Sequence, residues 1–256
     1  MKKGQTTVFI IIALIVVGLV GVFFLLRGDG VSVDRTEINP DVVPVYSFVQ
    51  DCIESVGEDA VYYVGQTGGY VIVPEDSLQL ETDEGWVGEI AYYLYEGENK
   101  MPLKMDVESE LSLYMNNFLK FCVGEFEDFS DFEIDDGGVR SDVKIEGDKV
   151  IFDVMYNLDI VRGENSYEID EFNGVEVVVR LGEIYEAIDE IMISQMEKTD
   201  AVCISCLQGI AQNHDLMVRM TEDEGGIVFG IVDAKSRIYE SNYEFYFANK
   251  YGEIGI

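Results

Sequence analysis

The chain has few of the residues from which common catalytic centres are built. Among its 256 residues there is one histidine, His214, and there is no Gly-x-Ser-x-Gly segment. A zinc site with three histidines is therefore excluded, and a Ser-His-Asp triad would have to use His214. Because His214 follows a predicted helix, we interpret it as a cation at the helix C-terminus or as a surface residue. The sequence predicts no catalytic residue, no metal ligand and no cofactor.

Basic residues are also scarce. Three of the 17 Lys and Arg residues lie in the first 27 positions, which contain no Asp or Glu. Residues 28–256 therefore contain 14 basic and all 50 acidic residues, which gives this part of the chain a net charge of −36. Such a charge repels nucleic acid and anionic lipid head groups, which excludes functions that depend on a basic patch. Because the acids are spread along the chain, we interpret them as a solvated surface in a salt-rich habitat and not as a ligand site.

One long apolar run interrupts this polar chain. Residues 8–26 carry no charge, and as a helix these 19 residues would span about 28 Å, close to the hydrocarbon thickness of a bilayer. The sequence therefore predicts a transmembrane helix from Val8 to Leu26, with the lipid bilayer as its partner. Lys2 and Lys3 precede it and only Arg27 follows closely, so the positive-inside bias places residues 1–7 in the cytoplasm and the rest outside the cell.

The residues before this run, Lys-Lys-Gly-Gln-Thr-Thr at positions 2–7, resemble the archaeal class III signal peptides of type IV pilin-like proteins. The resemblance implies cleavage between Gly4 and Gln5 with the apolar helix retained. Many pilins have at the position of Phe9 a Glu that is associated with subunit assembly, so the resemblance implies processing but not filament formation. A simple signal anchor is the alternative.

Two later segments carry a looser resemblance. Gln66–Tyr70 and Tyr92–Gly97, with Pro102 and a helix that ends in Cys122, are similar to a group of uncharacterised, membrane-anchored archaeal surface proteins. This resemblance implies no known activity.

Beyond a polar linker at 27–38, the pattern predicts a mixed domain over residues 39–256. Apolar periodicity indicates helices over 39–65, 106–122 and 184–195, and another that ends near 212, with Tyr63, Tyr114 and Phe118 on inward faces. Alternation or short apolar runs indicate strands over 70–73, 86–95, 139–145, 150–160, 175–181, 216–220, 227–231 and 243–247. The expected fold class is α+β: one N-terminal transmembrane helix, then an extracytoplasmic domain of amphipathic helices and antiparallel sheet. Two halves dividing near 129–137 and one compact domain are both compatible with this pattern.

Four cysteines could form two disulfides in an oxidising compartment. Cys52 and Cys122 each lie on the predicted inward face of a separate helix, and Cys203 and Cys206 form a CxxC motif. We therefore predict the pairs Cys52–Cys122 and Cys203–Cys206. The CxxC motif could instead run disulfide exchange, but the aromatic and proline residues usual beside such motifs are absent, and zinc lacks further ligands.

An acidic segment has some features of a calcium loop. Asp131, Glu133 and Asp135 occupy alternate positions, but Asp136 stands where an EF-hand loop needs Gly, and Asp142 stands where it needs Glu. We interpret the segment as an acidic turn between two elements.

Two classes of function fit these features. The favoured one is a membrane-anchored cell-surface structural or interaction protein, pilin-like in export, that acts in assembly or adhesion with protein partners and no nucleic acid. The alternative is an extracytoplasmic thiol-disulfide enzyme, or another enzyme, centred on Cys203 and Cys206.

Overall fold

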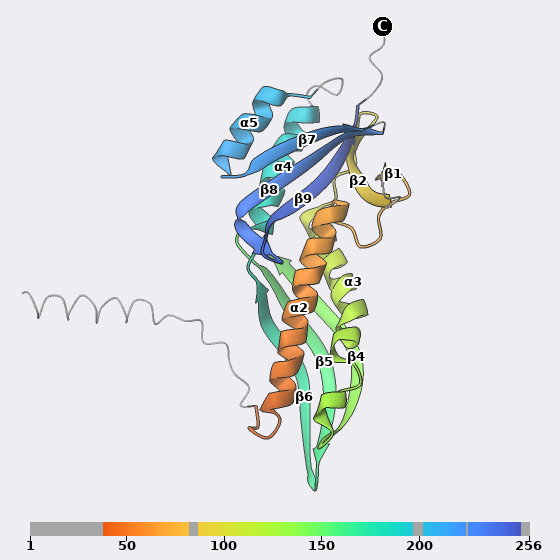
Figure 1. Ribbon diagram of the computed structural model, residues 1–256, viewed down its shortest axis with the longest axis vertical. Helices are drawn as coiled ribbons and strands as arrows, with labels where there is room; N and C mark the ends of the chain where they lie inside the picture. Colours follow the sequence, from red (N-terminus) through yellow and green to blue (C-terminus); the bar gives the residue numbers. More distant parts are fainter. Residues whose placement is uncertain (1–37, 82–86, 197–201, 224, 252–256) are drawn as a thin grey trace, which may run out of the picture. The chain divides into compact units, whose positions relative to one another are not determined.

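The computed structural model describes residues 38–81, 87–196, 202–223 and 225–251. The chain from Pro40 onward forms one compact unit (Figure 1). Within the described ranges its elements are α2 (Val43–Thr67), β1 (Ser77–Glu81), β2 (Val87–Tyr95), β3 (Glu98–Asn99), α3 (Lys104–Val123), η1 (Glu127–Phe129), β4 (Glu133–Ile145), β5 (Val150–Arg162), β6 (Asn165–Val177), α4 (Leu181–Met196), α5 (Ile204–Asn213), β7 (Met217–Asp223), β8 (Gly226–Ile238) and β9 (Ser241–Lys250).

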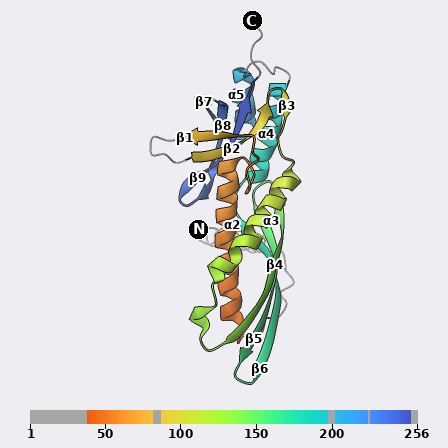
Figure 2. The ribbon, with the colours of Figure 1, turned by 90° about the vertical axis from the view of Figure 1, so that its right-hand side faces the viewer.

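The smaller sheet is the antiparallel meander β4-β5-β6 that the period-two pattern predicts. Every second side chain of β5 from Val150 to Ile160 is buried, and the alternate ones are partly or fully exposed. Helices α2 and α3 cover the buried face (Figure 2). A fully buried side chain such as Phe152 stabilises the fold by about 1.5–3 kcal/mol relative to leaving it in water.

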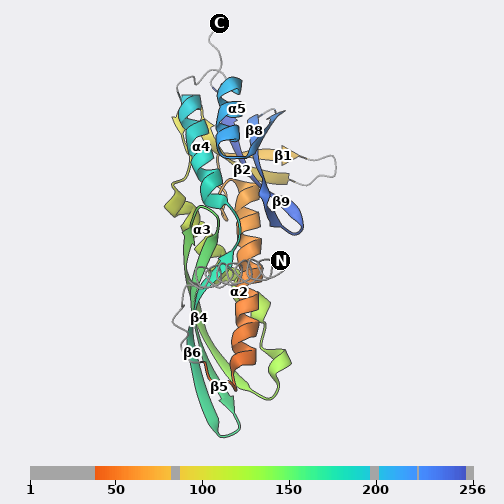
Figure 3. The same ribbon diagram turned by 90° about the vertical axis from the view of Figure 1, so that its left-hand side faces the viewer.

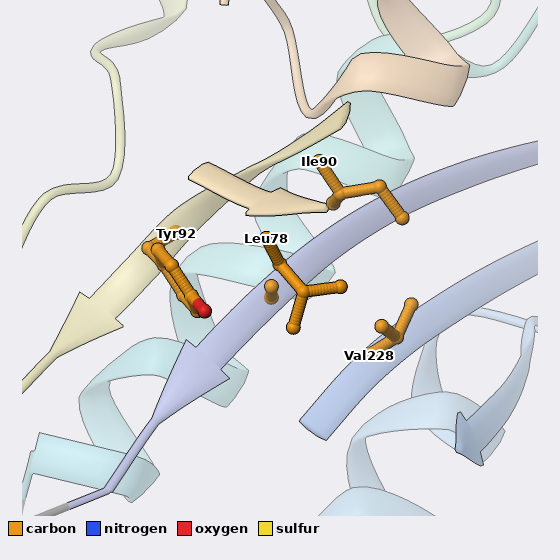
Figure 4. Close-up of a cluster of buried hydrophobic side chains, with 5 residues drawn as sticks. Leu78, Ile90, Tyr92 and Val228 are labelled. Carbon is orange, nitrogen blue, oxygen red and sulfur yellow. The ribbon is translucent and has the colours of Figure 1, made fainter. Parts of the chain in front are cut away.

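The larger sheet has the strand order β1-β2-β9-β8-β7, with β3 paired to β2. Its inner face carries a stack of buried rings in which the Phe247 ring lies 4.8 Å from Tyr93 and 5.0 Å from Phe229. Helices α4 and α5 lie side by side along these strands (Figure 3). A second buried cluster on the other face joins β1 and β2 to β8 and β9 through Leu78, Ile90, Tyr92, Val228 and Ala248 (Figure 4).

Helix α2 packs against both sheets, with contacts to β6, β9 and β2. The sequence predicts that Gly65 ends this helix, but the helix continues to Thr67. A Cβ atom at Gly65 would lie 2.8 Å from the carbonyl oxygen of Glu244, so glycine is needed there for close contact with β9. Gly68, with φ of 77°, ends the helix instead because glycine adopts the left-handed conformation without steric cost.

The fold class expected from the sequence requires two corrections, although the described residues do form an α+β domain. None of the helices within the described ranges is long and apolar enough to cross a membrane. The larger sheet is also not purely antiparallel, because β2 pairs in parallel with β9, with Tyr95 opposite Lys250. No local pattern encodes a pairing between strands about 155 residues apart. The expected span Val8–Leu26 and the cleavage site at Gly4 and Gln5 lie outside the described residues.

The predicted strand at 70–73 is also wrong. These residues form an irregular loop, and the Val71 N–H donates a hydrogen bond to the Glu110 carboxylate of α3 at 2.6 Å. A side chain distant in sequence therefore satisfies the backbone here, and β1 begins only at Ser77.

Candidate functional site

The structure pairs the four cysteines in the way that the sequence predicts. Cys52 of α2 and Cys122 of α3 form one disulfide with Cα atoms 5.7 Å apart, and Cys203 and Cys206 form the other with Cα atoms 5.3 Å apart. Cys52 is buried, but Cys122 is exposed, so the inward position predicted for Cys122 is wrong.

The Cys203–Cys206 disulfide lies at the first turn of α5, where both cysteines are partly exposed. The Cys203 N–H donates to Oε1 of Gln195, a fully buried side chain that also accepts a hydrogen bond from the Tyr251 hydroxyl. Within the described ranges, no three His, Cys, Asp or Glu side chains are grouped to hold a metal ion. The CxxC pair is thus a disulfide that is anchored to α4 and reaches the surface.

His214 caps the C-terminus of α5, as the sequence predicts, and lies between two carboxylates of α4. Its Nδ1 is 2.7 Å from Glu183 Oε1, and its Nε2 is 3.4 Å from Glu190 Oε1. Burial lowers the pKa of His214, but the hydrogen bonds and charges of the two glutamates outweigh burial, so the pKa is raised above 6.5. Both ring nitrogens are engaged, which makes His214 a link between α5 and α4.

Stability is expected to depend on pH through His214. Because its pKa is raised in the folded state, the protonated ring contributes fully below about pH 6.5, and the contribution is lost as pH rises through the folded pKa. His214→Gln should therefore lower the free energy of unfolding most near about pH 6 and less toward about pH 9. Urea unfolding of both proteins measures this difference. A difference that is constant across this range would mean that folding does not shift the pKa of His214.

Asp233 of β8 is the one charged residue that is fully buried in the part of the chain that the structure describes. Its carboxylate accepts hydrogen bonds from Arg180 Nη1 at 3.0 Å, from the Lys235 N–H at 3.0 Å and from Ser236 Oγ at 2.6 Å. Arg180 also donates from Nη2 to the carbonyl oxygen of His214 at 2.8 Å. This network joins the start of α4, the end of α5 and strand β8, which is a structural role.

The acidic segment at 131–142 is not the turn that we expected, because most of it belongs to β4. Asp136 lies 2.6 Å from Lys120 Nζ and accepts a hydrogen bond from the Tyr156 hydroxyl at 2.7 Å. Burial raises the pKa of Asp136, but the hydrogen bonds from Lys120 and Tyr156 outweigh burial and hold it below its ordinary value. This carboxylate is therefore already neutralised by groups of the protein.

The exposed aromatic side chains of the described residues belong to two groups of ring contacts, one between α2 and α3 and one between α2 and the β8–β9 turn, and the groups meet at the adjacent residues Tyr62 and Tyr63. There are five of them, and Phe121, with 80% of its side chain exposed, is the most accessible. Two partly buried tyrosines adjoin them. We call the seven side chains the aromatic band: Tyr62 and Tyr63 of α2, Tyr114, Phe118 and Phe121 of α3, Tyr239 of the β8–β9 turn and Tyr246 of β9.

On its α3 side the band is a continuous row of rings. Ring centroids from Tyr63 through Tyr114 and Phe118 to Phe121 are 5.7, 4.4 and 6.0 Å apart in succession. The β8–β9 hairpin and α3 flank α2 on opposite sides (Figures 1 and 2), so α2 forms the middle of the band. Aromatic rings of this kind are enriched at protein interfaces.

On its β-hairpin side the band borders an open groove of about 620 Å³ between α2 and the β8–β9 hairpin. The Tyr62 and Tyr239 rings meet edge to face in this groove, with centroids 5.4 Å apart. The Tyr239 hydroxyl donates to the Asp59 carboxylate, and the Tyr246 hydroxyl donates to Glu244. Burial and the bond to Glu244 raise the pKa of Tyr246 to about 12, so its hydroxyl stays protonated.

The turn that carries Tyr239 has an uncommon backbone. Tyr239 and Glu240 have φ angles of 51° and 63°, the left-handed region that hairpin turns normally fill with Asn and Gly. Each side chain in this region costs roughly 1–2 kcal/mol. The contacts of the Tyr239 ring and hydroxyl with α2 offset part of this cost and hold the ring in the groove.

Carboxylates of α2 lie beside the band. Glu54, Glu58 and Tyr62 are spaced by four residues and so share one helix face, and Asp59 lies next to it. Burial raises the pKa of Glu58 and of Asp59, and the charges of Glu54 and Asp59 raise that of Glu58 further. Within the described ranges, no Lys, Arg or His lies within ion-pair distance of these three carboxylates.

Comparison with known proteins gives no family for this chain. No protein-family model, no curated protein and no solved structure matches it.

Sequence reasoning missed the aromatic band because it assigned several of its rings to the core. Tyr63 and Phe118 follow the apolar periodicity of their helices, yet they are 39% and 41% exposed. Periodicity locates a helix face but does not reveal whether a sheet covers its margin. The adjacent pair Tyr62 and Tyr63 was an available signal, because two neighbouring helix positions point in directions about 100° apart and cannot both face the centre of one core.

Proposed function

We propose that this protein is an extracytoplasmic interaction protein that binds a macromolecular partner through the aromatic band and acts in assembly or adhesion at the cell surface. The observation that carries the proposal is that every exposed aromatic side chain of the described residues belongs to the aromatic band, whose two groups of rings meet at Tyr62 and Tyr63. Scattered exposed hydrophobic residues need no explanation, whereas clustered aromatic rings rimmed by polar residues are typical of binding surfaces.

Two features support a location outside the cytoplasm. Both cysteine pairs are disulfides, and such bonds persist mainly in oxidising compartments. The acidic composition also suits a surface that remains soluble in salt-rich surroundings.

Site-specific photo-crosslinking in intact cells that make the protein tests the proposal. A benzophenone amino acid replaces Phe121 or Tyr62 in the band, and Val178 or Met155 serves as an equally accessible control elsewhere. We expect a discrete crosslinked product from both band positions and none of that mass from the control positions. Products of the same kind from all four positions, or none from the band, would contradict the proposal.

A second candidate function is thiol-disulfide exchange at Cys203 and Cys206. It is favoured by one observation, the partly exposed position of this pair at the N-terminus of α5, where the helix dipole stabilises a thiolate. Equilibration with glutathione redox buffers followed by thiol alkylation measures the reduction potential. A value of about −270 mV or higher fits an exchange catalyst, and one below about −300 mV fits a structural bond.

A further inference from the structure

The chemistry of the partner follows from what surrounds the aromatic band. We infer that the band binds a basic polypeptide segment of another protein, with arginine or lysine side chains held over the tyrosine rings and against the carboxylates of α2. This inference rests on the proposed function and names the class of partner that the band would bind.

The first argument is the unpaired negative charge beside the rings. Glu54 and Glu58 are one helix turn apart, and like charges at this spacing repel each other. Within the described part of the chain neither carboxylate has a cation of the protein within ion-pair distance. A cationic side chain of a partner would remove this repulsion and reach Tyr62, the next residue on the same helix face.

The second argument is the groove in which this helix face ends. Its volume of about 620 Å³ is large enough for one or two extended side chains. It presents the ring of Tyr62 in contact with that of Tyr239, and it is also lined by Glu240 and Glu244. The negative face of a tyrosine ring attracts a cation placed over it, and the attraction is stronger when water is excluded.

Two basic residues of the protein, Arg219 and Arg237, lie near the groove, but they do not pair with all of its carboxylates. Arg219 Nη1 is 3.1 Å from Glu244 Oε1, and Arg237 donates to the backbone carbonyl of Glu240. Arg219 therefore neutralises Glu244, whereas no cation of the described residues pairs with the Glu240 carboxylate. The free negative charge is concentrated on the α2 side of the groove and at its turn.

The charge of the whole chain points to the same class of partner. With 50 acids and 17 bases, the protein favours basic segments over anionic ones, including nucleic acids and acidic membranes. Salt shortens the range of this preference, so the rings and carboxylates of the band would supply the specific contacts at short distance.

The test uses two synthetic peptides of the same length. The first is an acetylated and amidated decapeptide of alternating arginine and serine, and the second has citrulline in place of each arginine, which keeps the shape and removes the charge. Isothermal titration calorimetry at about 0.15 M and about 0.5 M salt measures binding, because the higher concentration screens long-range attraction. We expect the arginine peptide to bind at least about tenfold more tightly than the citrulline peptide at both salt concentrations.

Three paired variants separate specific from general attraction. Tyr62→Ser with Tyr239→Ser removes two rings at constant charge, and Glu54→Gln with Glu58→Gln removes two charges beside the band. Glu164→Gln with Glu168→Gln removes two exposed charges at the β5–β6 end of the smaller sheet and serves as the matched control. Binding of the arginine peptide should weaken about fivefold or more in the first two variants and less than about twofold in the control.

Either of the following sets of results would overturn the inference. Equal losses in the carboxylate variant and the control would show that only the total charge matters. Equal binding of both peptides, or binding of a neutral oligosaccharide without preference for arginine, would show that the rings serve an uncharged ligand. The crosslinking experiment detects a partner of the band whatever its charge. A crosslinked product together with any of these peptide results would therefore overturn the inference about a basic partner but not the proposed function.

Discussion

Replacing Asp233 by alanine is expected to lower the free energy of unfolding by about 3–5 kcal/mol, because removing one partner of a buried ion pair leaves the other without compensation. The Asp233 side chain is fully buried, and the Arg180 guanidinium, 3.0 Å away, has only 18% of its side chain exposed. The variant would also leave the Ser236 hydroxyl and the Lys235 N–H without their acceptor. Chemical unfolding of both proteins at neutral pH measures the loss.

Asp215 provides the control for this prediction. It pairs with Lys235 at 2.8 Å, a neighbour of the same network, but 73% of its side chain is exposed. Asp215→Asn removes the charge and keeps a residue type that tolerates the left-handed backbone of Asp215, with φ of 53°. It should leave the melting temperature almost unchanged, because solvent and salt screen exposed pairs. If Asp233→Ala were as mild as Asp215→Asn, the network would contribute little to stability.

Removal of the Cys52–Cys122 disulfide is expected to cost about 4 kcal/mol, because the bond closes a loop of 70 residues and so restricts the unfolded chain. Cys52 is buried and Cys122 is exposed, so the matched replacement is Cys52→Ala with Cys122→Ser. For a domain of this size the melting temperature should fall by roughly 10 °C. Calorimetry under non-reducing conditions measures the change.

The second disulfide is the internal control. Cys203 and Cys206 are three residues apart, so the same reasoning assigns their bond about 2 kcal/mol or less. Replacing both by serine should therefore lower the melting temperature much less than the change at Cys52 and Cys122. Equal effects would contradict the loop-entropy explanation and would indicate that the turn before α5 depends on its disulfide.

Local patterns in the sequence were sufficient to predict the secondary structure of much of the domain. The alternation from Val150 to Ile160 predicts β5 and its buried face, and the meander with β4 and β6 follows from short connections. The two disulfide pairs match the predicted ones, although Cys122 does not lie on the inward helix face from which its pairing was argued. These predictions succeed because each depends on residues close together in the chain or on a choice among only three pairings.

Local patterns did not predict the contacts between segments that are far apart in the chain. The parallel pairing of β2 with β9 joins residues about 155 positions apart, and Gly65 lies within α2 at a close approach to Glu244 of β9 instead of ending the helix. The loop at 70–73 has strand-like composition but is held by the Glu110 carboxylate. In each case a partner from another part of the chain overrides the local preference.

By itself the sequence determined the α+β composition of the described domain, its acidic charge and the cysteine pairs, because propensity, charge and spacing are properties of short segments. Only the tertiary structure decided which aromatic side chains are exposed. Tyr63 and Phe118 match a core pattern, yet they are 39% and 41% exposed. Exposure depends on how far a neighbouring element extends, and so the aromatic band became visible only when α2, α3 and the β8–β9 hairpin were placed together.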